Sequence, residues 1–147
     1  MLQGDFCEEI GDYPENCFDV VILSHTLQQI RQPKELLLDM LRIGRRVIVS
    51  FPNYAHWYVR LQVLFTGLAP MTDQLPYDWY DTPNIRIISI KDFQRFMLQF
   101  GMRAVRELAI NTHHHETKGN QVRYLKNLRA TYGIIMLELA QNAGQRR

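Results

Sequence analysis

Histidine is the residue type in this chain best suited to proton transfer, and the sequence holds five of them. His25 directly follows an apolar run that ends at Ser24. An imidazole there is the natural general base by type, because its ordinary pKa lies near neutral pH. A lone histidine is nevertheless more often a packed or solvated side chain than a catalyst. We therefore assign no catalytic residue from this pattern.

The sequence offers two candidate groups of metal ligands, and both are weak. His113, His114 and His115 are consecutive, and adjacent loop residues rarely converge on one ion. Cys7 and Cys17 are spaced unlike any common zinc motif. We expect the histidines to lie in a solvated loop, the thiols to be reduced as in a cytoplasmic protein, and no metal to be bound.

Aromatic and acidic side chains are concentrated in residues 77–84, which include Tyr77, Trp79, Tyr80 and Asp81. Ordering a loop costs conformational entropy, so a loop this rich in aromatic rings is expected to bury them on something. Two alternatives remain open: the segment folds back over a cleft as a lid, or it contacts another protein.

The central elements are predicted from two apolar runs, residues 18–23 and 47–51, with one helix between them. Runs without polar alternation indicate strands that are buried on both faces, as in a parallel sheet. Pro33 suits the first turn of that helix, and Gly44 is predicted to close it in a left-handed conformation. Strand, helix and strand form a right-handed βαβ unit, so the fold is α/β. A ligand is then expected at the carboxyl ends of the strands, near residues 24–29 and 51–56. Tyr54 and His56 lie there and are predicted to line a cleft or contact a partner.

Further helices are predicted on both sides of the aromatic segment. Asn53 is a suitable N-cap for a helix that ends near Gly67, and its buried side is predicted to carry Trp57, Leu61, Leu64 and Phe65. Ser89 and Asp92 form a capping box before a second helix, which carries a core stripe of Phe93, Phe96, Met97 and Phe100 and ends at Gly101.

Residues 103–110 and 131–139 are predicted to be strands that form an antiparallel hairpin at one edge of the sheet. The 147 residues correspond to one domain, over residues 1–140, followed by a frayed tail at 141–147. A net charge of +2 gives no argument for nucleic acid binding, and no apolar run is long enough to span a membrane.

Three stretches of the sequence carry a specific resemblance. The pattern FDVVILSHTLQQI, a helix ending MLRIG, and RRVIVSFPN resembles the second half of a class I S-adenosylmethionine-dependent methyltransferase. Within that class, FPNYAHWYVRLQVLFTG and LPYDWYDTPNIRIISIKDF are similar to the MetW family of methionine biosynthesis proteins. The similarity covers residues 1–101 and weakens toward residue 139. It implies a partial doubly wound, Rossmann-like methyltransferase sheet, mainly parallel, with a C-terminal antiparallel hairpin.

The resemblance also implies positions for S-adenosylmethionine. Asp5, with Phe6, matches the family position whose carboxylate accepts from the adenine amino group. Ser24, His25 and Leu27 match the segment that lines the methionine end of the cofactor.

The implied pathway is methionine biosynthesis, beside a homoserine O-acyltransferase. We expect a non-catalytic partner or regulator of that enzyme, with residues 77–84 as the contact surface. The alternatives are a methyltransferase that works only with a missing N-terminal half, and an inactive fragment.

Glycine placement is the reason for expecting a truncated domain. The eight glycines include no G-x-G, whereas a dinucleotide-like site needs a glycine-rich turn after its first strand. Two βα units, roughly 60 residues, would then be absent. Strand 18–23 would become an exposed edge, and we expect this chain to self-associate through it.

Overall fold

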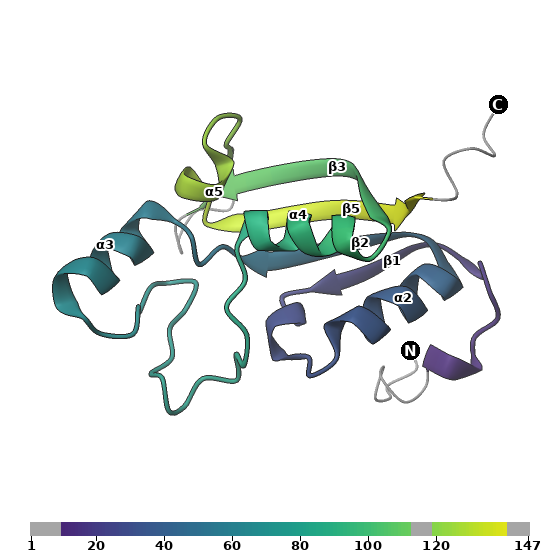
Figure 1. Ribbon diagram of the computed structural model, residues 1–147, viewed down its shortest axis with the longest axis horizontal. Coiled ribbons are helices and arrows are strands. Elements are labelled where there is room, and N and C mark those ends of the chain that lie inside the picture. The colour runs from purple at the N-terminus through teal and green to yellow at the C-terminus, as the bar shows by residue number, and fades with distance from the viewer. Residues whose placement is uncertain (1–9, 113–118, 141–147) are drawn as a thin grey trace.

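The computed structural model describes residues 10–112 and 119–140, and Figure 1 shows their arrangement as one twisted sheet with helices. Several predictions from the sequence fall outside these residues. They concern the tail at 141–147, Asp5, Phe6, Cys7 and the three consecutive histidines. The strands are β1 (Phe18–Ser24), β2 (Gly44–Pro52), β3 (Met102–Asn111), β4 (Asn120–Gln121) and β5 (Tyr132–Leu139). The α-helices are α2 (Pro33–Ile43), α3 (Trp57–Thr66), α4 (Ile90–Gln99) and α5 (Lys126–Arg129), and the 3-10 turns are η1 (Ile10–Asp12) and η2 (Leu27–Gln29).

The strand order in the sheet is β1-β2-β5-β3-β4. β1 and β2 are parallel, with Val21 opposite Val47 and Ser24 opposite Ser50. β5 inserts between β2 and β3 and is antiparallel to both. The predicted α/β methyltransferase-like fold and its C-terminal hairpin are confirmed. Within the described residues, parallel pairing is confined to β1 and β2, because the hairpin joins the sheet through its second strand.

Helices α2 and α4 lie side by side on one face of the sheet (Figure 1). That face carries Val47, Val49 and Phe51, all fully buried, and the Phe51 and Phe93 rings lie 5.0 Å apart. The predicted capping box is confirmed, since Ser89 Oγ accepts from the amide of Asp92 at 3.1 Å. The packing of α2 and α4 on this face holds in place the end of the sheet where the candidate site lies.

The opposite face of β1 is open. Phe18, Val20 and Ile22 are 41%, 42% and 66% exposed, so the sequence-based expectation of a strand buried on both faces is wrong for β1. Among the described residues β1 is the outermost strand on its side of the sheet. An apolar strand with an open edge is prone to pair with another chain.

Gly44 does not adopt the predicted left-handed cap. Its φ of −120° and ψ of 140° are extended, and the residue opens β2. The reason for glycine is a close approach: a Cβ there would lie 2.5 Å from Val21 Cγ2 on the neighbouring strand. Gly101, by contrast, has a φ of +68° and ends α4 as predicted.

Helix α3 also differs from the sequence-based expectation. Asn53 is not its N-cap, which is His56, and Trp57, Leu61, Leu64 and Phe65 are exposed rather than buried. Within α3 only Val59 is buried. Helical spacing identified an apolar face, but this helix projects beyond the sheet end, where the described residues offer no layer to cover it (Figure 1). No helix among the described residues has the length and apolar character needed to cross a membrane.

Candidate functional site

The candidate site lies at the carboxyl ends of β1 and β2, where the sheet leaves side chains open to solvent. The Ser24 and Ser50 hydroxyl oxygens are 3.1 Å apart. The amide of His25 donates to the carbonyl of Ser50 at 3.0 Å. This bond prolongs the parallel ladder by one residue and holds the turn after β1 against β2.

His25 itself has a φ of +54°, in the left-handed region. Histidine is among the residues enriched there, yet the conformation still costs free energy relative to a helical or extended backbone. It turns the exposed imidazole away from the strand direction and toward β5. The carbonyl of His25 accepts from Gln28 Nε2 at 2.8 Å, which helps to hold the turn.

Tyr132 completes this cluster, and sequence reasoning missed it. Its ring meets the His25 ring edge to face, with centroids 5.0 Å apart. Burial raises the pKa of Tyr132, and the negative charge of Asp73 raises it further, so the phenol is neutral at pH 7 and can donate a proton in a hydrogen bond. The sequence held one signal for Tyr132. If the last strand runs antiparallel to β2, its first residue must lie at the end of the sheet where β2 ends.

Asp73 belongs to the loop that follows α3, and its negative charge acts on the Tyr132 phenol. The cluster itself combines an imidazole, a neutral phenol and two hydroxyls. This set can bind polar groups and exchange protons, and no group of three or more metal-ligating side chains occurs among the described residues.

The structure brings the predicted cofactor residues together only in part. Ser24 and His25 are exposed and can face a ligand. Leu27 is only 2% exposed and packs in the core instead. Asp5 and Phe6 lie outside the described residues, and β1 has no strand on its outer side among those described. These side chains can contact a cofactor from one side but do not enclose it.

Asn53 connects the end of β2 with α4 and α5. Its buried side chain donates to the carbonyls of Asn127 and Ala130 at 3.0 and 2.8 Å. Its carbonyl oxygen accepts from the amides of Ala55 at 3.2 Å and Ile90 at 3.3 Å. Asn53 therefore helps to cap α4, a distant helix, rather than the helix that follows it in sequence.

Tyr54 and His56 lie beside this junction. Burial raises the pKa of Tyr54, although a hydrogen bond with Asn84 partly offsets the effect. His56 is half-buried against Leu75 and Thr131, in a space of about 10 Å³. That volume admits at most about one water molecule, so His56 packs against the returning loop.

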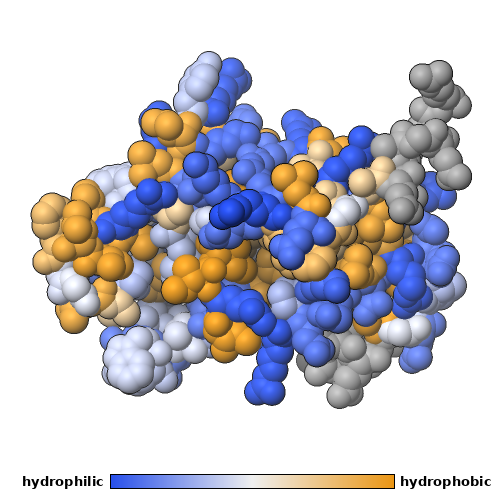
Figure 2. Space-filling view, in the orientation of Figure 1, coloured by the Kyte–Doolittle hydropathy of each residue, from blue (hydrophilic) through white to orange (hydrophobic). Residues whose placement is uncertain are grey.

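Beyond the sheet end, α3 and the aromatic segment form an exposed apolar surface, visible over α3 at the left of Figure 2. We call this the end surface. Trp79 and Tyr80 are 77% and 73% exposed and contact each other edge to face. The lid alternative would bury these rings over a cleft, and in this structure they are not buried. The end surface comprises Trp57, Tyr58, Leu61, Leu64, Phe65, Leu68, Tyr77, Trp79 and Tyr80.

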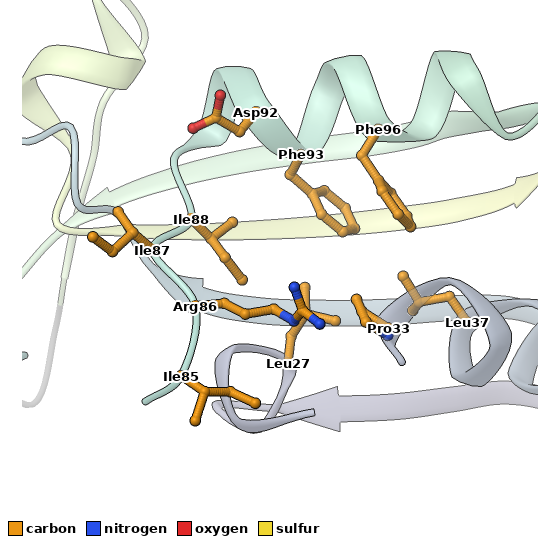
Figure 3. Close-up of a pocket in the computed structure, with 10 residues that line it drawn as sticks. All are labelled: Leu27, Pro33, Leu37, Ile85, Arg86, Ile87, Ile88, Asp92, Phe93 and Phe96. Atoms are coloured by element: carbon orange, nitrogen blue, oxygen red, sulfur yellow. The ribbon is translucent and has the colours of Figure 1, made fainter. Parts of the chain in front are cut away.

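A separate pocket of about 370 Å³ opens between α2 and α4, on the helix-covered face (Figure 3). Phe93 and Phe96 line it from α4, and Leu27 and Leu37 line it from the opposite side. Arg86 reaches across and donates to the carbonyls of Ile30 and Arg31. The guanidinium fastens the segment before α4 to the turn before α2.

Comparison with known proteins identifies the sequence family. The family model of the methionine biosynthesis protein MetW matches residues 1–137. A relative from Rhodopirellula baltica, the bifunctional methionine biosynthesis protein MetXA/MetW, is 40% identical over 103 residues. The match covers 69% of this chain and 16% of that relative.

Solved structures with the same fold are S-adenosylmethionine-dependent methyltransferases. One comes from Thermotoga maritima and is described as a possible histamine N-methyltransferase. Its TM-score is 0.58 at 12% identity, and the match covers 87% of this chain and 58% of the Thermotoga chain. Another, from Archaeoglobus fulgidus, has a TM-score of 0.60 at 12% identity, and the match covers 92% of this chain and 66% of the Archaeoglobus chain. This chain is thus similar in fold to about three-fifths of a methyltransferase domain.

Proposed function

This chain belongs to the family of the methionine biosynthesis protein MetW, and we propose on that premise that it serves a homoserine O-acyltransferase as a non-catalytic partner or regulator. The observation that carries the proposal is the bifunctional MetXA/MetW relative, in which a MetXA part and a MetW part share one polypeptide. Proteins joined in one chain are held at high effective concentration, which favours a physical contact between them.

The end surface supports this role. Monomeric proteins rarely leave large contiguous apolar patches exposed, and such patches mark sites of protein contact. Trp and Tyr are the residues most often found as binding hot spots. Trp79 and Tyr80 are the most exposed aromatic side chains of residues 77–84, and we assign them the central position in the contact.

Methyl transfer is the alternative, and the fold and the exposed Ser24–His25 edge favour it. S-adenosylmethionine would supply an activated methyl group, with Ser24 and His25 facing its methionine end. The 147 residues contain no G-x-G turn, and β1 lacks an outer neighbour among the described residues. We therefore propose that this chain does not hold the cofactor tightly unaided.

The decisive experiment is a pair of calorimetric titrations of the full 147-residue chain. A homoserine O-acyltransferase from the same organism is titrated first, and S-adenosylmethionine is titrated separately. We expect saturable binding of the acyltransferase and no heat of binding for micromolar S-adenosylmethionine. Trp79→Ala and Tyr80→Ala should each weaken acyltransferase binding by about 2 kcal/mol, roughly thirtyfold in Kd.

Tyr124→Ala is the matched control, because Tyr124 is 79% exposed, similar to Tyr80, and lies outside the end surface. It should leave acyltransferase binding unchanged. Micromolar binding of S-adenosylmethionine without acyltransferase binding would favour the methyltransferase alternative. Absence of both would favour an inactive fragment.

A further inference from the structure

A second pocket, of about 350 Å³, lies between the N-terminal ends of α3 and α4 and is lined by three basic side chains. Arg60 comes from α3, and Lys91 and Arg95 come from α4. Asp92 is the acidic residue that lines it. Tyr54, Ala55 and Ile87 supply ring and aliphatic surface beside the cations.

The three cations are not neutralised by carboxylates among the described residues. No ion pair there involves Arg60, Lys91 or Arg95. Asp92 Oδ2 accepts from Ser89 Oγ at 2.6 Å, so that carboxylate is engaged in the capping box. The pocket therefore keeps an excess of positive charge.

Lys91 and Arg95 are four positions apart on α4, which places them on the same face of the helix. Like charges at this spacing destabilise a helix by about 0.2–0.5 kcal/mol. Arg60 adds a third positive charge from across the pocket. An anionic ligand in the pocket would offset this repulsion.

The ligand would be held by side chains rather than by the backbone amides of the helix end. Those amides already have acceptors: Ile90 N donates to Asn53 Oδ1, Lys91 N donates to Asn127 Oδ1, and Asp92 N donates to Ser89 Oγ. The positive end of the α4 dipole still favours an anion nearby.

We propose that this pocket binds a small organic phosphate. Three cationic side chains that line one pocket suit a doubly charged group, and arginine suits the geometry of phosphate oxygens. The volume lies at the lower end of the 300–1,000 Å³ found for small-molecule sites, which leaves room for a compact organic group against Tyr54 and Ile87. This site lies after β2 and is distinct from the His25–Tyr132 cluster after β1.

The test is an NMR titration of the ¹⁵N-labelled 147-residue chain with phenyl phosphate at constant ionic strength. We expect saturable shifts of the Tyr54, Ala55 and Lys91 amides, weaker shifts with inorganic phosphate, and none with phenol. Lys91→Gln and Arg95→Gln should each raise the Kd for phenyl phosphate about tenfold, because each removes a charge-assisted hydrogen bond.

Arg31→Gln removes the same charge from an exposed residue outside the pocket and should change the Kd by less than twofold. Neither Lys91→Gln nor Arg95→Gln should lower the melting temperature, since each relieves like-charge repulsion. Absence of saturation, or an equal loss of affinity in Arg31→Gln, would overturn the assignment.

Discussion

The imidazole of His25 meets the phenol ring of Tyr132 edge to face, with 5.0 Å between centroids and 75° between ring planes. The two residues are far apart in sequence and come together because β1 and β5 both flank β2. Ser50 lies on the strand between them and accepts the His25 amide. The pair therefore fastens the turn after β1 to the first residue of the last strand.

A double-mutant cycle measures this contact. His25→Asn keeps a residue tolerant of the left-handed conformation, and Tyr132→Leu removes the aromatic ring. We expect a coupling free energy of about 0.5–1.5 kcal/mol, as for other aromatic pairs, from chemical denaturation of the four proteins. Strict additivity of the two single changes would show that the rings do not interact.

Asn53→Ala should be among the most destabilising polar substitutions in the chain. It removes four hydrogen bonds at a residue that is 3% exposed, and two carbonyls and two amides lose this partner. We expect a loss of about 2–4 kcal/mol in the free energy of unfolding, measured by urea denaturation. Asn120→Ala, at an exposed position, should cost less than about 0.5 kcal/mol; a similar loss in both variants would contradict the role of Asn53.

Gly44→Ala tests how closely β1 and the end of α2 approach Gly44 on β2. The new Cβ would lie 2.5 Å from Val21 Cγ2 and 3.1 Å from the Met40 carbonyl oxygen. Overpacking of this kind costs about 1–3 kcal/mol. In a Val21→Ala background the penalty for Gly44→Ala should shrink, because the clashing methyl group is gone. An unchanged penalty in that background would place the strain elsewhere.

Alkaline pH should reduce stability through Tyr54 and Tyr132, whose pKa values are raised in the folded protein. The folded state then holds a phenol proton that the unfolded chain releases near pH 10. The stabilisation is present in full below pH 10 and is lost as the pH rises through the raised pKa values. Melting temperatures from pH 8 to 12 should fall less steeply in Tyr132→Phe than in wild type.

Tyr124→Phe is the control for that experiment, because Tyr124 is largely exposed. Its melting temperature should follow the wild-type pH dependence. Asp73→Asn should lower the pKa of Tyr132 toward its ordinary value, since Asp73 contributes to raising it. A Tyr132 titration that is unaffected by Asp73→Asn, followed by NMR of the labelled ring, would contradict the electrostatic effect of Asp73 on Tyr132.

The open edge of β1 predicts self-association. Val20 and Ile22 present apolar surface beside unpaired backbone groups, and lysine at an edge strand opposes pairing between chains. Val20→Lys/Ile22→Lys should shift the sedimentation profile from oligomer to monomer. Leu98→Lys, at a 78% exposed helix position, should leave the oligomer intact. A wild-type chain that is monomeric at all concentrations would refute the prediction.

The elements with local signals could be predicted from the sequence. The apolar runs of β1 and β2, Pro33 at the start of α2, and the Ser89–Asp92 capping box all act over a few residues, and each is where the sequence indicates. Gly101 ends its helix for the same local reason. The family resemblance is confirmed by the family match.

Features that depend on distant contacts could not be predicted this way. Asn53 has the type of an N-cap, but its acceptor faces α4, whose position is set by the sheet. Helical spacing in α3 identifies an apolar face without saying whether another layer covers it. Tyr132 joins the site only because β5 inserts beside β2, a pairing that no local pattern encodes.

Fluorine NMR can report directly on the proposed contact with a homoserine O-acyltransferase. The chain has two tryptophans, so labelling with 5-fluorotryptophan gives two signals, and comparison with Trp57→Phe assigns the one from Trp79, which is 77% exposed in the free protein. Addition of unlabelled acyltransferase should shift and broaden that signal to saturation as the ring becomes buried. A Trp79 signal that stays unchanged at saturating acyltransferase would contradict the proposal that this chain acts through its end surface.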